Sequence, residues 1–113
     1  MSQSKELVAA SATPMILSIL SRGETYGYAI IREIRELSDT RIEWTDGMLY
    51  PVLRRLEKQR LLQSEWRVAE TGKKRRYYRI KKSGRAALSE QRMQWQLTNR
   101  VLSKLWKETP CLT

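Results

Sequence analysis

The chain has 113 residues, which is enough for one compact domain with a modest core. Its 22 lysines and arginines outnumber its 12 acidic residues, and the net charge of +10 favours a polyanionic partner. It has no histidine, one cysteine (Cys111), no glycine-rich phosphate loop and no clustered carboxylates, so we predict no intrachain disulfide, catalytic residue, metal site or cofactor.

Residues 5–21 carry overlapping apolar faces at helical spacing and predict a first helix. Pro14 leaves two interpretations: Thr13 and Pro14 begin the helix, or one longer helix bends where Pro14 cannot donate to the carbonyl of Ala10. We favour the bent helix because the alanine-rich stretch before Pro14 propagates helix well. The apolar run 15–20 is too short to span a membrane and lacks signal-peptide form, so we expect a cytoplasmic protein.

A second helix is predicted from Tyr26 to Ser38, with Thr25 as its cap and Gly23 ending the helix before it. Its apolar stripe consists of Ile30, Ile31, Ile34 and Leu37. Gly27 in the first turn is unfavourable for a helix, and we interpret it as a point of close approach between helices.

Residues 39–44 form a connector with a short extended piece at 41–44, and Thr45 and Asp46 are N-cap candidates for a third helix. The buried stripe of this helix is predicted to be Leu49, Val52, Leu53 and Leu56. Pro51 again leaves two alternatives. The helix begins near Asp46 and bends at the proline, or it begins only after Tyr50.

A β-hairpin follows the third helix, which we expect to close at Leu61 and Leu62. Its predicted parts are a strand at 63–68, a turn at 70–73 and a return strand at 76–80. Tyr77 and Tyr78 are neighbours in the return strand, so only one of them can face the core. The segment 73–85 holds eight basic residues and no acidic one.

Ser83 is expected to cap a last helix that runs to about Lys107, with Gly84 in its first turn. This helix is long for a domain of this size, and its heptad-like positions are Leu88, Gln91, Trp95, Thr98, Leu102 and Leu105. Little core is left for it to cover in its own chain. We therefore expect it to pack on a second copy and form a homodimer.

The predicted order of three helices, two strands and one helix is a mainly helical α+β fold, the winged helix-turn-helix. We divide the chain into a winged-helix DNA-binding domain at 1–82, a dimerisation helix at 83–107 and a flexible tail at 108–113. In this fold the third helix enters the major groove of DNA, and the hairpin is the wing. Double-stranded operator DNA is therefore the expected partner.

Within this fold, the start of the third helix is expected to read sequence and the wing tip to contact phosphates. The predicted DNA-binding residues are Thr45, Gly47, Met48, Tyr50, Arg54, Arg55, Lys73, Lys74, Arg75 and Arg76. We interpret Asp46 as a cap that compensates the helix dipole rather than as a DNA contact.

Three segments, TYGYAIIREI, DGMLYPVLRRLEKQRLL and RRYYRIKKSGR, resemble the PadR family of bacterial transcriptional regulators in this order. The resemblance covers about residues 5–106. It implies a dimeric winged-helix repressor with a C-terminal dimerisation helix, and it supports a proline inside the recognition helix at Pro51. The single C-terminal helix resembles the short subgroup. Its multidrug-sensing members place paired tryptophans beside a pore between subunits, and Trp95 has the matching position.

Trp95 has two interpretations, as a packed interface residue or as a wall of an effector site. An indole suits a small planar aromatic effector, a cationic one included. If Arg92 and Arg100 face the pore they disfavour a cationic effector, and an anionic or phenolic compound or no effector is then expected. The predicted effector-binding or dimer-interface residues are Trp95, Leu88, Leu102 and Leu105.

The alternative functions are a small-molecule sensor acting mainly at Trp95, and an adaptor that uses the basic patch on RNA or a membrane surface. The adaptor is disfavoured because no apolar stripe accompanies the basic run and no aromatic RNA-binding motif is present.

Overall fold

The structure is a computed structural model that describes residues 3–108. Its elements are α1 (Lys5–Ser21), β1 (Thr25–Tyr26), α2 (Gly27–Leu37), α3 (Asp46–Lys58), β2 (Leu62–Val68), β3 (Lys74–Ile80) and α4 (Lys82–Glu108). The tail predicted at 108–113, with Cys111, lies outside the described residues apart from the last residue of α4.

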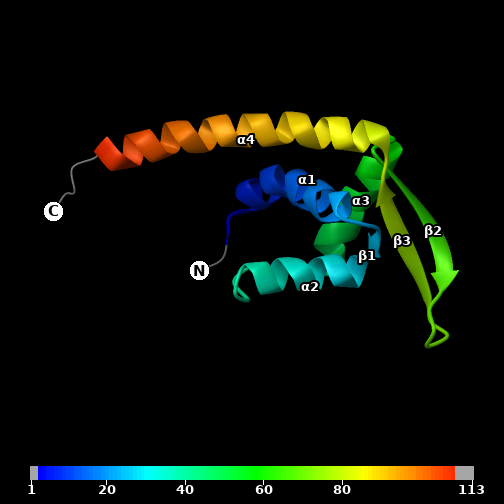
Figure 1. Cartoon of the computed structure of the whole chain (residues 1–113). Coiled ribbons are helices and arrows are strands. Elements are labelled where there is room, and N and C mark those ends of the chain that lie inside the picture. Colours follow the sequence, from blue (N-terminus) through cyan, green and yellow to red (C-terminus); the bar gives the residue numbers. More distant parts are fainter. Residues whose placement is uncertain (1–2, 109–113) are drawn as a thin grey trace.

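The arrangement is a mainly helical winged helix-turn-helix, which confirms the predicted fold class (Figure 1). The three helices α1, α2 and α3 pack together beside a small antiparallel sheet of order β1-β3-β2. Figure 1 shows the hairpin of β2 and β3, with its turn at 69–73, reaching away from the helices. We call this hairpin the wing. The helix α4 runs back from the sheet along α1 and beyond it, so the longest dimension of the molecule is 58 Å.

The first helix is a single helix from Lys5 with Pro14 inside it, so the alternative start at Thr13 is wrong. Ser4 is its N-cap, and the Ser4 hydroxyl accepts a hydrogen bond from the Leu7 N–H at 3.1 Å. The predicted glycine ends it as expected, since Gly23 follows the C-cap with a φ of 149° that favours glycine.

The strand β1 was not predicted, and it replaces the expected Thr25 cap. Thr25 and Tyr26 pair with Tyr78 and Tyr77 of β3, so their backbone polar groups join the sheet. The helix α2 consequently begins at Gly27 with Tyr26 at the N-cap position.

The third helix begins at Asp46 and contains Pro51, which confirms the first of the two predicted alternatives. Thr45 occupies the N-cap position. The helix ends at Lys58 rather than at Leu61 and Leu62, and this expectation was wrong because the chain turns sharply before them.

The turn after α3 is centred on Arg60, whose φ of 64° lies in the left-handed region. The Arg60 N–H donates to the Glu57 carbonyl at 2.9 Å, and the Leu61 N–H donates to the Leu56 carbonyl at 3.0 Å. These two bonds form a Schellman ending, in which an arginine stands where glycine is more usual. Because the chain changes direction at this turn, Leu62 leaves the helix axis and begins β2.

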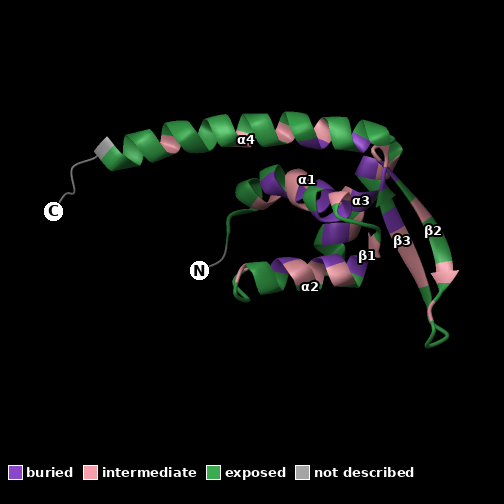
Figure 2. Cartoon of the chain, viewed as in Figure 1, coloured by how far each residue is buried: buried purple, intermediate pink, exposed green. Residues whose placement is uncertain are grey.

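The core lies where α1, α2, α3 and the sheet meet, and Figure 2 shows the buried residues gathered there. The predicted stripes supply Ile30, Ile34, Leu49, Leu53 and Leu56, while Ile31 and Val52 are half-buried. Leu37, the last residue of the predicted apolar stripe of α2, is 71% exposed and lies outside the core. Residues 41–44 lie in the connector between α2 and α3, outside any helix or strand, and Trp44 enters the core.

The wing strands pair from Leu62 with Ile80 to Val68 with Lys74. Tyr78 is 4% exposed and packs in the core, and Tyr77 lies on the other face of β3, as predicted. One face of the wing therefore continues the core, and the other faces outward.

The last helix begins at Lys82, so Ser83 lies inside it and is not its cap as predicted. The Ser83 hydroxyl donates to the Arg60 carbonyl at 2.6 Å and ties α4 to the turn after α3. Leu88 is 7% exposed and belongs to the core of its own chain. Most of α4 beyond Leu88 is exposed (Figure 2). Among residues 3–108, no helix is both long and apolar enough to cross a membrane.

Candidate nucleic-acid interface

A cleft of about 720 Å³ lies between the start of α2, α3 and the wing. Its walls are mainly aromatic and basic, with one glycine and one acidic residue among them: Tyr26, Gly27, Tyr28, Tyr50, Arg54, Glu57, Trp66, Lys73, Lys74, Arg75, Arg76 and Tyr78. The folded chain thus brings the predicted third helix and the predicted basic turn to the two sides of one cleft. A wall of this composition suits a phosphate backbone with bases or sugars beside it.

The start of α3 is open to solvent. Thr45, Gly47 and Met48 are exposed there, and Met48 retains 39% of its accessible surface. They stand at the N-terminal end of the helix, which is the end that meets base edges in helix-turn-helix proteins. The exposed start of α3 is therefore available to a partner.

Tyr50 is held between α3 and α2. A side chain at Gly27 would overlap the Tyr50 hydroxyl, so Gly27 provides the close helix approach predicted for it. Burial and the nearby Asp46 carboxylate raise the pKa of Tyr50. The phenol therefore stays neutral and keeps its O–H as a hydrogen-bond donor in the cleft.

The structure separates the two arginines in the middle of α3. Arg54 is exposed and lines the cleft. Arg55 turns toward α1 and donates to the Thr13 hydroxyl at 2.8 Å. Of this predicted pair, Arg54 lines the cleft and Arg55 does not.

The four basic residues at the wing turn also differ from one another. Lys73 and Lys74 are exposed at the tip. The Arg75 guanidinium lies over the Tyr26 ring, 4.4 Å from its centroid. Arg76 hydrogen-bonds within the chain to Ser64 and Glu57. Sequence reasoning treated these residues as one group, whereas the fold gives them different surroundings.

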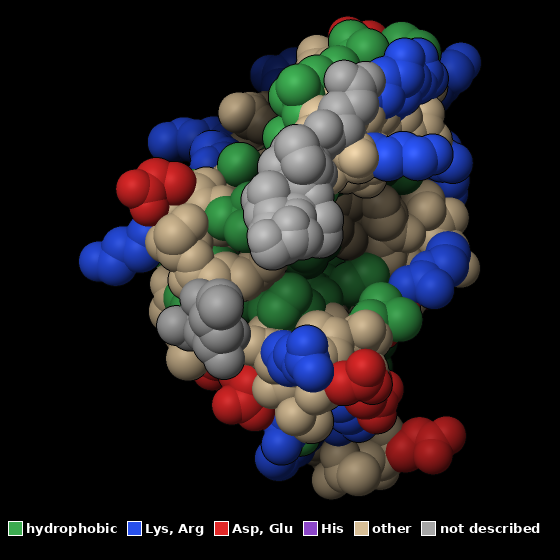
Figure 3. Space-filling model, turned by 90° about the vertical axis from the view of Figure 1, so that its left-hand side faces the viewer, with side chains coloured by type: hydrophobic (Ala, Val, Ile, Leu, Met, Phe, Trp, Pro, Cys, Tyr) green, Lys and Arg blue, Asp and Glu red, His purple; other side chains and the backbone are tan. Residues whose placement is uncertain are grey.

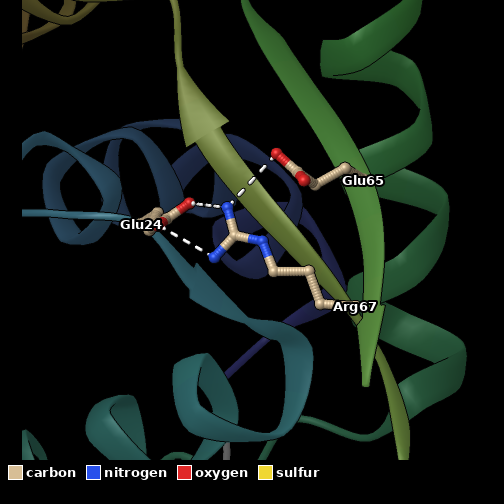
Figure 4. A network of polar contacts seen from close by, with 3 residues as sticks. All are labelled: Glu24, Glu65 and Arg67. Carbon is tan, nitrogen blue, oxygen red and sulfur yellow. Dashed lines mark hydrogen bonds and ion pairs between the residues drawn. The ribbon is translucent and has the colours of Figure 1, made fainter. Parts of the chain in front are cut away.

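Arg67 holds the outward face of the wing through two carboxylates, Glu24 and Glu65 (Figure 4). Arg67 of β2 donates two hydrogen bonds to Glu24, at 3.0 and 2.7 Å, and one to Glu65 at 3.2 Å. Its guanidinium crosses β3 over the Tyr77 ring at 4.8 Å. Hydrogen bonding to Arg67 lowers the pKa of both carboxyl groups, so both are charged at neutral pH. This clamp joins the wing to the loop before β1.

Sequence reasoning missed the aromatic residues of the cleft, Tyr26, Tyr28 and Trp66. The position of Trp66 could have been predicted from the sequence, because the alternation of β2 places Trp66 on the same face as Leu62. Tyr26 depends on β1, which is too short to have a readable pattern.

A separate apolar groove of about 460 Å³ lies between α1, the end of α2 and α4. It is lined by Ser11, Pro14, Met15, Ser18, Ile19, Arg22, Ile34, Leu37, Ser38, Ile42 and Trp95. Figure 3 shows hydrophobic side chains gathered in a hollow on one face of the molecule. Of the residues predicted for an effector or dimer interface, Trp95 lines the groove, Leu88 lies in the core, Leu102 is half-buried and Leu105 is exposed.

Comparison with known proteins connects this fold to a family. Residues 16–90 match the model of the "Transcriptional regulator PadR-like family". "Uncharacterized protein X" of Lysinibacillus sphaericus is 31% identical over 90 residues, which are 80% of this chain and 83% of that protein. "Transcriptional regulator Rv3488" of Mycobacterium tuberculosis is 50% identical over 58 residues, which are 51% of this chain and 53% of that protein.

Solved structures agree with this match. A transcriptional regulator from Clostridium thermocellum, Cth-833, superposes with a TM-score of 0.80 at 33% identity, over 88% of this chain and 97% of that one. The PadR-like regulator BC4206 of Bacillus cereus superposes with a TM-score of 0.78 at 26% identity, over 90% and 97% of the two chains.

Proposed function

Since the chain belongs to the PadR-like family and is a transcriptional regulator rather than an enzyme, we propose that it is a repressor that holds operator DNA in the cleft between α3 and the wing. The observation that carries the proposal is that one side of α3 and the basic wing tip line the same cleft, while the start of α3 beside it is exposed.

The helix α3 and the wing have different tasks in this proposal. The exposed start of α3, with Thr45, Gly47 and Met48, reads base edges in the major groove. Lys73 and Lys74 on the wing neutralise phosphates, which adds affinity without sequence information. Arg54 and Tyr50 contribute from the α3 side, Arg54 as a cation and Tyr50 as a hydroxyl donor.

We also propose that the regulator acts as a homodimer joined through α4. Large apolar side chains stay exposed along this 27-residue helix: Met93, Leu97, Val101, Leu105 and Trp106. An apolar face of this extent favours a protein partner, and a second copy related by a two-fold axis is the simplest one. Such a dimer presents two α3 helices to two half-sites of one operator.

Salt titration of DNA binding tests the proposed cleft. The protein is titrated against a fluorescent duplex, selected from a random library by the protein itself, at several salt concentrations. Changing Lys73 and Lys74 together to alanine should weaken binding to every duplex. It should also reduce the slope of log K against log salt by about 0.9 for each phosphate that the variant no longer neutralises.

The matched control removes the same charge elsewhere. Lys5→Ala with Lys82→Ala lowers the net charge equally, at two exposed positions that do not line the cleft. If both double variants change the slope alike, the protein binds DNA through its overall charge and the proposed cleft is wrong.

A further inference from the structure

A polar network ties the wing to the recognition helix. The Ser64 hydroxyl of β2 donates to one carboxylate oxygen of Glu57 at 2.6 Å and accepts a hydrogen bond from Arg76 Nε at 2.9 Å. Arg76 Nη2 donates to the other Glu57 oxygen at 3.4 Å. The three side chains close a ring of hydrogen bonds in which each donor has an acceptor.

The members of this ring come from both walls of the cleft. Glu57 stands in the last turn of α3, and Ser64 and Arg76 lie on adjacent strands of the wing. The Arg76 guanidinium also lies 5.7 Å from the centroid of the Trp66 ring. Glu57, Trp66 and Arg76 all line the cleft. The network therefore joins its two walls directly.

Arg76 differs in this respect from the lysines at the wing tip. Its Nε and Nη2 atoms are both engaged within the chain, whereas Lys73 and Lys74 are exposed. The side chains of Arg76 and Glu57 keep 40% and 29% of their accessible surface, and ion pairs with this much access to water add little to folding stability. The planar guanidinium, bonded through two of its nitrogens, instead fixes the orientation of the wing relative to α3.

We propose that Arg76 and Glu57 are positioning residues for sequence recognition, which hold the wing at a set angle to α3 and so fix the cleft's width. This rests on the proposed function. A sequence-specific complex needs base contacts from α3 and phosphate contacts from the wing at the same time. A wing released from α3 still finds phosphates on any duplex, but it no longer holds α3 in register with the bases.

The test separates positioning from phosphate contact by two readouts on each variant. One is the preference for the duplex selected by the unchanged protein over a scrambled duplex of equal composition. The other is the salt slope on the scrambled duplex. Arg76→Ala should reduce the preference by about tenfold and leave the slope unchanged. Lys74→Ala should lower the slope by about 0.9 and leave the preference unchanged.

A charge exchange supplies the third arm. Glu57→Arg combined with Arg76→Glu rebuilds the ion pair with reversed ends, and it should recover the preference to within about threefold of the unchanged protein. An acid at position 76 that faced DNA would instead repel phosphate. Arg76→Lys keeps the charge but loses the fork, so it should lose preference and keep the slope even if the alanine variant is poorly folded.

The proposal is overturned if Arg76→Ala lowers the slope as Lys74→Ala does and the exchanged pair fails to recover the preference, because Arg76 is then a phosphate contact. If the unchanged protein binds neither duplex, the proposed function falls together with this inference. Binding by the unchanged protein without an Arg76 effect on preference overturns this inference alone.

Discussion

At the scale of single residues, two helical glycines show how surroundings decide what a position tolerates. A Cβ at Gly84 would overlap the Leu61 carbonyl oxygen and the Ile80 side chain, where α4 crosses the root of the wing. That carbonyl already accepts from the Lys81 N–H at 2.9 Å, so it is fixed in place. A Cβ at Gly47 would meet only the Thr45 hydroxyl oxygen, at an ordinary 3.8 Å.

Alanine at these two positions should therefore act in opposite directions. Gly84→Ala should lower the free energy of unfolding by about 1–3 kcal/mol, because backbone must move to admit the methyl group. Gly47→Ala should raise it by up to about 1 kcal/mol, because alanine is the better helix former in an open first turn. Urea unfolding of both variants measures the difference, and equal effects would contradict the packing described at Gly84.

Side-chain partners are the part of the site that sequence could not supply at this scale. The basic run and the exposed start of the third helix could be predicted from composition and pattern. Arg55 donates a hydrogen bond to Thr13, 42 positions away in the sequence, and Arg76 donates one to Glu57, 19 positions away. No local pattern carries such pairs. The prediction therefore grouped arginines to which the fold gives different partners.

At the scale of elements, periodicity predicted the helices α1 to α4 and the wing strands β2 and β3, but the ends of these elements depended on the backbone. Leu61 and Leu62 continue the apolar pattern of α3, so the sequence extends the helix to them. The helix ends earlier because Arg60 adopts a left-handed conformation, which a glycine would have indicated in the sequence and an arginine does not. β1 holds two residues and becomes a strand only by pairing with β3.

The wing is an element supported from two sides. Arg67 ties its outward face to Glu24 before β1, and the ring of Glu57, Ser64 and Arg76 ties its inward face to α3. A two-stranded hairpin is marginally stable alone, so these ties explain how it keeps one direction. The basic tip depends on them for its place beside α3.

At the scale of the whole molecule, α4 extends well past the hydrophobic core of its own chain. Leu88 packs inside the chain, while Leu102 is half-buried and Leu105 is 57% exposed further along the same heptad seam. The sequence predicted the seam but could not tell which of its turns are covered by the chain's own helices. The first turns pack on the core, and most residues of the later turns are exposed.

The proposed dimer should depend on those later turns. Leu102→Glu combined with Leu105→Glu should raise the dimer dissociation constant by about a hundredfold or more, because two apolar side chains lose their burial and charges take their place. Sedimentation equilibrium measures it. Gln96→Glu with Ser103→Glu adds the same charge on the opposite side of α4 and should leave the dimer intact. Dissociation by both pairs would contradict an interface along the seam.

Repeated selection from a random duplex library tests most directly whether α3 reads sequence while the wing supplies affinity. The unchanged protein, Met48→Ala, and the Lys73→Ala and Lys74→Ala double variant each select their preferred duplexes. We predict that Met48→Ala enriches an altered sequence, whereas the wing variant enriches the original sequence with weaker binding. An altered sequence from the wing variant, with the original sequence retained by Met48→Ala, would contradict this division of tasks.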